Sequence, residues 1–269
     1  MIIIGEKING AIPSIRQAIA ERDEALITER TLAQAAAGAD FLDCAPATAT
    51  ELEYDAMVWL IEIMQGCTDT RLCIDSPNAG LLARIIGEDR LHKPGMVNSV
   101  NEEGDKCETI FPLIAGTPWE VVGLTCDRDG IPSDPQKKVD IARRIIDKAV
   151  KYGVALGQLH IDPCVMSLAA VPTAMEDFLT CIEAIHACAP EVKVTGAISN
   201  VSFDMPARKY VNMGCVSYAM AAGLDSAILD PCSQDMMGMI YACEALRMRD
   251  KGGRKYNRAY RKGLFGQKK

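Results

Sequence analysis

The sequence lacks several features that would each assign the protein to a particular class. None of its apolar runs approaches the ~20 residues that a membrane-spanning helix needs. The first ten residues, MIIIGEKING, hold neither a basic leader nor a small-residue cleavage site, so we expect a cytoplasmic protein. No linker rich in Pro, Gly or Ser divides the 269 residues. A core of this size needs no disulfide or metal to stabilise it, and α/β barrels commonly take this length as one domain.

Clustered metal ligands are also missing, although cysteine is frequent. The eleven cysteines form no CxxC pair, and only three histidines are available beside them. Zinc and iron–sulfur sites need closer spacings, so we expect no metal bound by the chain itself. Several cysteines lie in apolar runs such as RLCIDS and FLTCIEAI, which predicts buried free thiols in a reducing compartment.

Negative charge is spread over most of the chain, and positive charge gathers at its C-terminal end. Residues 247–269 hold ten Lys or Arg and one acid, a net charge of +9, although the whole chain carries −7. Residues 1–246 therefore carry −16 and would repel nucleic acid. We expect residues 247–269 to form a solvated, partly frayed basic tail, with docking on an acidic partner or subunit as the alternative.

Strand-like runs alternate with helical patterns along residues 1–246, as is typical of parallel βαβ units. Eight such units in this length favour a (β/α)8 TIM barrel. The main alternative is a doubly wound sheet, but the GxGxxG turn that would follow its first strand is missing. The predicted strands are residues 2–8, 41–45, 71–76, 96–100, 120–126, 158–163, 193–200 and 226–231.

Polar side chains stand at or near the ends of these predicted strands. All strands of a barrel point their carboxyl ends at one mouth, so these side chains are expected to converge. A single Asp in such a place often caps the next helix. Asp75, Asn98 and Asp162, however, lie within or at the end of apolar runs, where an unpaired polar group is costly. The predicted strand tips are Glu6, Asp43, Asp75, Asn98, Thr125 or Asp127, Asp162, Asn200 and Asp230.

The chemistry of these tips predicts the kind of ligand. Carboxylates and amides with no Lys or Arg among them disfavour a phosphate and favour a neutral heterocycle rich in hydrogen-bond donors. An Asp can accept from an amino group and the adjacent ring N–H, as on the 2-amino-4-oxopyrimidine edge of a pterin. In KVTGAISNVSF (193–203), Gly196 would allow close approach of the ligand, and Ser199 and Asn200 stand at the tip. Arg208 is the nearby cation that could reach the ring or an acidic tail of the ligand.

Taken together, the motifs resemble those of the methyltetrahydrofolate:corrinoid methyltransferases. These are single-domain, pterin-binding TIM barrels related to the folate module of cobalamin-dependent methionine synthase. The resemblance keeps the order and spacing of the motifs to about residue 246. Its motifs are GEKING (5–10), CIDSPN (73–78), MVNSVN (96–101), HIDP (160–163), GAISNVSF (196–203), Arg208 with Asn212, and GLDSAILD (223–230).

The resemblance implies a reaction and roles for individual residues. A methyl group would move between N5 of tetrahydrofolate and the cobalt of a corrinoid carried by a separate protein, with family members acting as homodimers that bind no metal of their own. Asp75, Asn98 and Asp162 would bind the pterin ring, and Arg208 would line the substrate site. From methyltetrahydrofolate, cobalt(I) attacks the methyl carbon in line and N5 must gain a proton. We expect Asn200 to lie beside N5 and to stabilise it as charge develops.

The sequence departs from the family pattern at two places. The D-x-N motif that many relatives have after strand two reads Asp43-Cys44-Ala45, so the contacts of that Asn are lost, and Phe203 replaces a polar residue of some relatives. The basic tail beyond Arg247 is expected to have no counterpart in the family.

Two other functions share the predicted pocket. Dihydropteroate synthase would carry a Ser-Arg-Lys type motif on strand seven, where this chain has Ser199-Asn200-Val201, and an Arg-x-His pair near the last strand, which is absent from Ser226–Pro231. A non-catalytic folate-binding protein is disfavoured because Asn200 and Arg208 are intact. The direction of transfer stays open between use of methyltetrahydrofolate, as in acetogens, and demethylation of methylamines or betaines.

Overall fold

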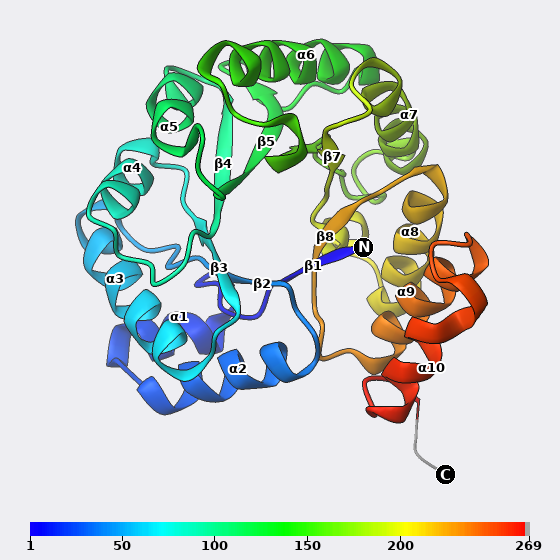
Figure 1. Ribbon diagram of the computed structural model, residues 1–269, viewed down its shortest axis with the longest axis horizontal. Coiled ribbons are helices and arrows are strands. Elements are labelled where there is room, and N and C mark those ends of the chain that lie inside the picture. Colours follow the sequence, from blue (N-terminus) through cyan, green and yellow to red (C-terminus); the bar gives the residue numbers. More distant parts are fainter. Residues whose placement is uncertain (267–269) are drawn as a thin grey trace.

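The computed structural model describes residues 1–266, and its eight strands form a ring that helices surround (Figure 1). Every neighbouring pair is parallel, in the order β7-β6-β5-β4-β3-β2-β1-β8. The predicted (β/α)8 barrel is therefore confirmed. The strands are β1 (Ile2–Gly5), β2 (Phe41–Cys44), β3 (Arg71–Asp75), β4 (Met96–Glu102), β5 (Glu120–Asp127), β6 (Leu159–Asp162), β7 (Lys193–Val194) and β8 (Ser226–Leu229).

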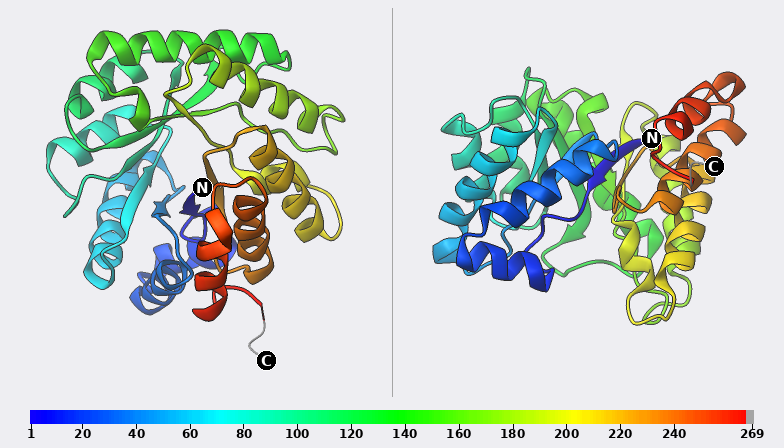
Figure 2. Two further views of the ribbon diagram at one scale, coloured as in Figure 1. Left: turned by 45° about the vertical axis from the view of Figure 1, so that its right-hand side comes forward. Right: turned by 90° about the horizontal axis from the view of Figure 1, so that it is seen from below.

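The helices cover the outside of the barrel and bury its outer face, as Figure 2 shows from two further sides. None of the helices within residues 1–266 is both long and apolar enough to cross a membrane. The helices are α1 (Pro13–Glu21), α2 (Glu24–Ala36), α3 (Thr50–Cys67), α4 (Ala79–Gly87), α5 (Lys106–Ile114), α6 (Pro135–Tyr152), α7 (Ala174–Cys188), α8 (Arg208–Ala222), α9 (Gln234–Leu246) and α10 (Arg254–Arg261), with 3-10 turns η1 (Leu156–Gln158), η2 (Ile198–Ser202) and η3 (Lys251–Gly253).

The ring closes most weakly between β7 and β8. The predicted strand over residues 193–200 is wrong beyond Val194, because the chain leaves the sheet and forms η2 with its own short-range hydrogen bonds. The N–H of Asn200 donates to the carbonyl of Ala197 at 3.1 Å, and the N–H of Phe203 donates to Asn200 at 3.2 Å. A bridge between Ala197 and Ile228 completes the ring.

The interior of the barrel is filled by apolar side chains from neighbouring strands. Ile4, Phe41, Cys73, Met96 and Val122 form one buried cluster inside the ring, separate from the larger layer between strands and helices. This packing is typical of TIM barrels, whose interior is a core rather than a pore. The space for a ligand is therefore at the ends of the strands.

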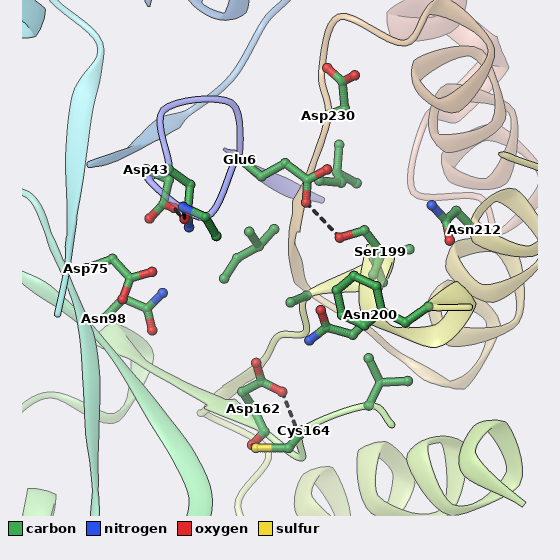
Figure 3. Close-up of a pocket in the computed structure, with 18 of the residues that line it drawn as sticks. Glu6, Asp43, Asp75, Asn98, Asp162, Cys164, Ser199, Asn200, Asn212 and Asp230 are labelled. Atoms are coloured by element: carbon green, nitrogen blue, oxygen red, sulfur yellow. Dashed lines mark hydrogen bonds between the residues drawn. The ribbon is translucent and has the colours of Figure 1, made fainter. Parts of the chain in front are cut away.

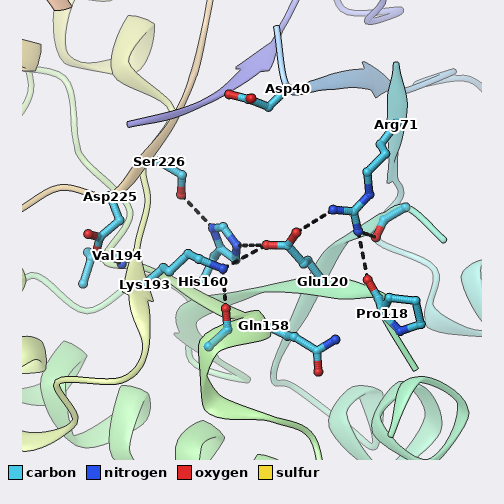
Figure 4. Close-up of polar contacts among 12 residues, drawn as sticks. Asp40, Arg71, Pro118, Glu120, Gln158, His160, Lys193, Val194, Asp225 and Ser226 are labelled. Atoms are coloured by element: carbon cyan, nitrogen blue, oxygen red, sulfur yellow. Dashed lines mark hydrogen bonds and ion pairs between the residues drawn. The ribbon is translucent and has the colours of Figure 1, made fainter. Parts of the chain in front are cut away.

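A charged network closes the N-terminal end of the barrel (Figure 4). Glu120 accepts from Arg71 at 2.7 Å, from the His160 ring at 2.7 Å and from Lys193 at 3.0 Å. Burial alone would raise the pKa of Glu120, but the hydrogen bonds from His160 and Lys193 outweigh it and lower that pKa to about 2. Burial lowers the pKa of His160, so the neutral ring donates to Glu120 and accepts from the hydroxyl of Ser226 at 2.7 Å. The network lies at the end of a TIM barrel that contributes to stability rather than to catalysis.

The basic C-terminal segment packs against the barrel. Two backbone N–H groups at the start of α10, those of Lys255 and Tyr256, donate to the carboxylate of Asp250, each at 2.9 Å. Phe265 is buried, and its ring lies 5.6 Å from that of Tyr241 on α9. The prediction of a partly frayed end is therefore wrong for residues 250–265, because an aromatic anchor that composition alone did not indicate fixes this segment.

Candidate active site

A cavity of about 1290 Å³ lies at the carboxyl ends of the strands (Figure 3). Because every strand is parallel, side chains that follow different strands in the sequence meet there. Most of the predicted site residues line it, namely Glu6, Asp43, Asp75, Asn98, Asp162, Ser199, Asn200, Arg208 and Asp230.

One wall of the cavity is made by Asp43, Asp75 and Asn98 from β2, β3 and β4. Asp75 and Asn98 are register partners on adjacent strands, so their side chains leave the sheet side by side. Asn9, from the loop after β1, donates to Asp43 at 3.3 Å. Burial raises the pKa of Asp43, and the neighbouring charge of Asp75 raises it further. Burial, with the charge of Glu53 behind it, raises the pKa of Asp75 to about 7.

Asp162 lines the same cavity from the end of β6, between Asn98 and Asn200 in the view of Figure 3. Its carboxylate accepts from the N–H of Cys164 at 2.7 Å. Burial raises the pKa of Asp162 to about 6, against the opposing effects of this hydrogen bond and of Lys138. The buried Lys138 ammonium donates to the carbonyls of Pro163 and Cys164, at 2.7 and 3.0 Å. The second oxygen of Asp162 is thus available to a donor in the cavity.

Glu6 and Ser199 link β1 to η2. The hydroxyl of Ser199 donates to Glu6 at 3.0 Å. Burial raises the pKa of Glu6, with the hydrogen bond from Ser199 opposing it. Lys7 pairs with Asp230 at 3.0 Å, so the carboxylate after β8 has a cation beside it.

Asn200 projects into the cavity from η2 (Figure 3). Arg208 supports that turn. The Arg208 guanidinium donates to the carbonyl of Ser199 at 2.7 Å and to the hydroxyl of Ser202 at 2.9 Å. It also lies 4.8 Å from the ring of Phe203. Arg208 therefore lines the cavity as predicted, but its hydrogen bonds hold the turn that carries Asn200.

Two predicted positions lie elsewhere. Gly196 does not line the cavity: an added Cβ would come within 2.7 Å of the ring of Phe178, so this glycine makes room for α7 rather than for a ligand. At β5 the side chain in the cavity is that of Leu124. Thr125 is buried, and Asp127 lies 3.6 Å from Arg144 outside the cavity.

Several cavity residues were missed because they belong to loops and helix starts rather than strand tips. Lys7 and Asn9 stand within GEKING, the segment after β1, and that motif was a usable signal. Lys106 and Lys209 begin α5 and α8, so the cavity has cations at its rim although the strand tips have none. Asn212, already singled out with Arg208, has a buried side-chain oxygen without a partner among residues 1–266.

Comparison with known proteins decides the family. Residues 14–230 match the family described as pterin binding enzyme. The chain belongs to that family. It is 43% identical over 268 residues to the methylcorrinoid:tetrahydrofolate methyltransferase of Eubacterium limosum, covering 99% of this chain and 98% of that protein. The predicted resemblance to the methyltetrahydrofolate:corrinoid methyltransferases is confirmed, and since the alignment includes residues beyond 247, the expectation that the tail has no counterpart is wrong.

Other pterin-binding proteins are more distant. The methionine synthase of Mycobacterium tuberculosis is 30% identical over 243 residues, which are 85% of this chain and 20% of that protein. The dihydropteroate synthase structures from Vibrio fischeri and Yersinia pestis align with TM-scores of 0.67 and 0.66 at 16% and 15% identity. Each covers 93% of this chain and 94% of its own. They show the barrel fold, and the dihydropteroate synthase alternative is not favoured.

Proposed function

We propose that the protein is a methyltransferase that moves a methyl group between N5 of tetrahydrofolate and the cobalt of a corrinoid carried by a separate protein. The observation that carries this proposal is the 43% identity along 99% of the chain to a methylcorrinoid:tetrahydrofolate methyltransferase. The cavity supports it, because the carboxylates and amides at the strand ends suit a donor-rich heterocycle.

The pterin edge would bind among Asp75, Asn98 and Asp162. Asp75 and Asp162 would each accept from ring N–H and amino groups, and Asn98 would offer a donor and an acceptor beside Asp75. Within residues 1–266 none of these carboxylates forms an ion pair. A neutral ligand with several donors would satisfy them without introducing a charge of its own.

Asn200 would act at N5. Both its backbone N–H and its carbonyl are used within η2, and its side chain forms no hydrogen bond with the residues described. The amide is therefore free to bind the ring nitrogen and to stabilise the charge that develops there as the methyl group moves. Arg208, by holding the carbonyl of Ser199, would position this turn.

The corrinoid would approach from the open side of the cavity. At about 1290 Å³ the cavity exceeds the ~300–1,000 Å³ that is usual for one small molecule. The extra space would accept the corrinoid face above the bound pterin. Holding the two reactants face to face would supply much of the rate, because it turns their encounter into an intramolecular step. The transition state is shared, so the same site would run in either direction.

We further propose a cytoplasmic homodimer. Tyr210 and Tyr218 are 73% and 65% exposed and lie about two turns apart on α8. Large aromatic side chains of this kind are enriched in protein interfaces. Light scattering on the purified protein would test this, since a monomer at micromolar concentration would contradict it.

The first test is calorimetric titration with methyltetrahydrofolate, repeated on Asp162→Ala. Micromolar binding that disappears in the variant would support the pterin site, whereas absence of binding by the wild type would overturn the proposal. A second assay follows methyl transfer to cobalt(I) cobalamin by its absorbance. Binding without transfer would favour the non-catalytic folate-binding protein instead.

A further inference from the structure

A buried carboxylate stands behind the pterin wall without lining the cavity. Glu53, in the first turns of α3, is 5% exposed and accepts from the hydroxyl of Ser76 at 2.6 Å. This distance is typical of a hydroxyl that donates to an ionised carboxylate. A charged side chain is rarely buried so completely without a reason, and Glu53 has no cation within ion-pair distance among the residues described.

Ser76 connects Glu53 to the site through hydrogen bonds. Its hydroxyl oxygen also accepts from the N–H of Asn78 at 3.0 Å, and its own N–H donates to the carbonyl of Asn98 at 2.9 Å. Ser76 directly follows Asp75, so one hydrogen-bonded turn joins the end of β3 to β4 and to the start of α4. Glu53 is the group that fixes the Ser76 side chain in this turn.

Within residues 1–266, the charges that act on Asp75 are negative, and the cations of the cavity, such as Lys106, stand at its rim. Glu53 faces it from α3 and Asp43 from β2, while Glu6 on the β1 side acts through Asp43. The β4 neighbour, Asn98, is neutral, and burial raises the pKa of the nearby Cys44 and Cys73 thiols well above the ordinary value, so they are neutral too. The carboxyl of Asp75 forms no ion pair within residues 1–266.

We propose that Glu53 is a positioning residue for the pterin site: it fixes the turn after Asp75 and, as a second buried negative charge, couples binding of the folate ring to release of a proton from Asp75. This inference rests on the proposed function, because it takes Asp75 to be an acceptor for the pterin edge.

The direction of the coupling follows from the groups involved. Burial and Glu53 raise the pKa of Asp75 to about 7 in the free protein. A pterin edge that donates two hydrogen bonds needs the ionised carboxylate, so at lower pH a proton must leave on binding. At pH 7 the site would release about half a proton, and binding at pH 6 would be about tenfold weaker than at pH 8. Asp43 and Asp75 are close enough to titrate as a pair, so the count refers to the pair.

The test compares Glu53→Gln with Glu51→Gln. The first keeps an oxygen acceptor for Ser76 and removes the buried charge, while the second removes an exposed charge from the same turn of α3. Calorimetric titration with methyltetrahydrofolate at pH 6, 7 and 8, in two buffers of different ionisation enthalpy, gives Kd and the protons released. The ligand's own titration is common to all three proteins and cancels in the comparison.

We expect the wild type and Glu51→Gln to lose about tenfold in affinity from pH 8 to pH 6, and Glu53→Gln to lose less than about fourfold, because burial of Asp75 remains. If Glu53→Gln binds more weakly than the wild type by the same factor at all three pH values, Glu53 has a structural role alone and the inference is overturned. If Glu53→Gln does not fold, a wild type that binds without releasing a proton at pH 7 overturns it as well. Absence of binding by the wild type at pH 8 would instead refute the proposed function.

Discussion

Replacement of Asn200 by alanine separates transition-state stabilisation from substrate binding. The side chain has no hydrogen bond within residues 1–266, so its removal leaves no group of the protein unpaired. The turn that carries it is held by other contacts, from Arg208 and Ser202 to the carbonyl of Ser199. The variant should therefore fold with an unchanged melting temperature.

The expected magnitude comes from the charge that N5 gains during transfer. Loss of one preorganised hydrogen-bonding group beside a developing charge costs ~10²–10³-fold in turnover. In the proposed site the neutral ground state would depend on the acceptors Asp75, Asn98 and Asp162, so the Kd for methyltetrahydrofolate should change by less than about threefold.

Stopped-flow measurement of methylcobalamin formation under single-turnover conditions gives the rate of the chemical step, and calorimetry gives Kd. Ser199→Ala is the matched control on the same turn, since it removes the hydrogen bond to Glu6 but leaves the side-chain amide of Asn200 in place. Equal losses of rate and affinity in Asn200→Ala would refute the transition-state role, and so would a rate for Ser199→Ala as low as that of Asn200→Ala.

Three other changes test the site and the fold. Asp162→Asn keeps an acceptor for the N–H of Cys164 and removes the buried charge, so affinity should fall ~10–100-fold while the melting temperature holds or rises; a drop in melting temperature would contradict this. Glu120→Gln leaves Arg71 and Lys193 without their anion, and because both are partly exposed we expect a loss of about 1–3 kcal/mol in unfolding free energy. Because the pKa of Glu120 is lowered from 4.5 to about 2, its stabilisation is complete above pH 4.5 and is lost as the pH falls toward 2. Denaturant unfolding at pH 7 and pH 3 should therefore show the difference between wild type and variant shrinking. Phe265→Ala should increase amide exchange in residues 254–261 and leave the barrel strands unchanged; unchanged exchange in α10 would show that Phe265 is not its anchor.

The sequence predicted the barrel and most of the site because both depend on the periodicity of the apolar residues and on the order of strands and helices. Each strand tip is marked by the end of an apolar run. Because the strands are parallel, the tips meet at one end of the barrel regardless of the length or sequence of the loops. The tip predicted for the seventh strand reaches the cavity in another way, since Asn200 lies on η2 rather than on a strand. There the local hydrogen bonds of a 3-10 turn outweighed the strand preference of the preceding residues.

Other features depended on tertiary contacts that no local pattern shows. Glu53 looks like an ordinary acid in the first turns of a helix, where the helix dipole alone would favour it, and its burial against Ser76 follows from how α3 meets the loop after β3. The order of the basic tail depends on Phe265 reaching α9, a contact that composition and charge do not encode. Lys106 and Lys209 line the cavity from the first turns of α5 and α8, which no strand pattern marks.

The acids at the two ends of the barrel differ in whether cations compensate their charge, and this difference accounts for the role of each end. At the N-terminal end Glu120 has Arg71, Lys193 and His160 around it, so its charge is already compensated and its pKa is low. At the other end the carboxyls of Asp75 and Asp162 form no ion pair within residues 1–266, and burial raises the pKa of each, to about 7 and about 6. Their loss of hydration is left for a ligand to compensate. A cation would satisfy one of them, but Asn98 beside Asp75 offers both a donor and an acceptor. A neutral ring that presents several donors and an acceptor along one edge would fit all three, and for this reason we expect the pterin to bind at the uncompensated end.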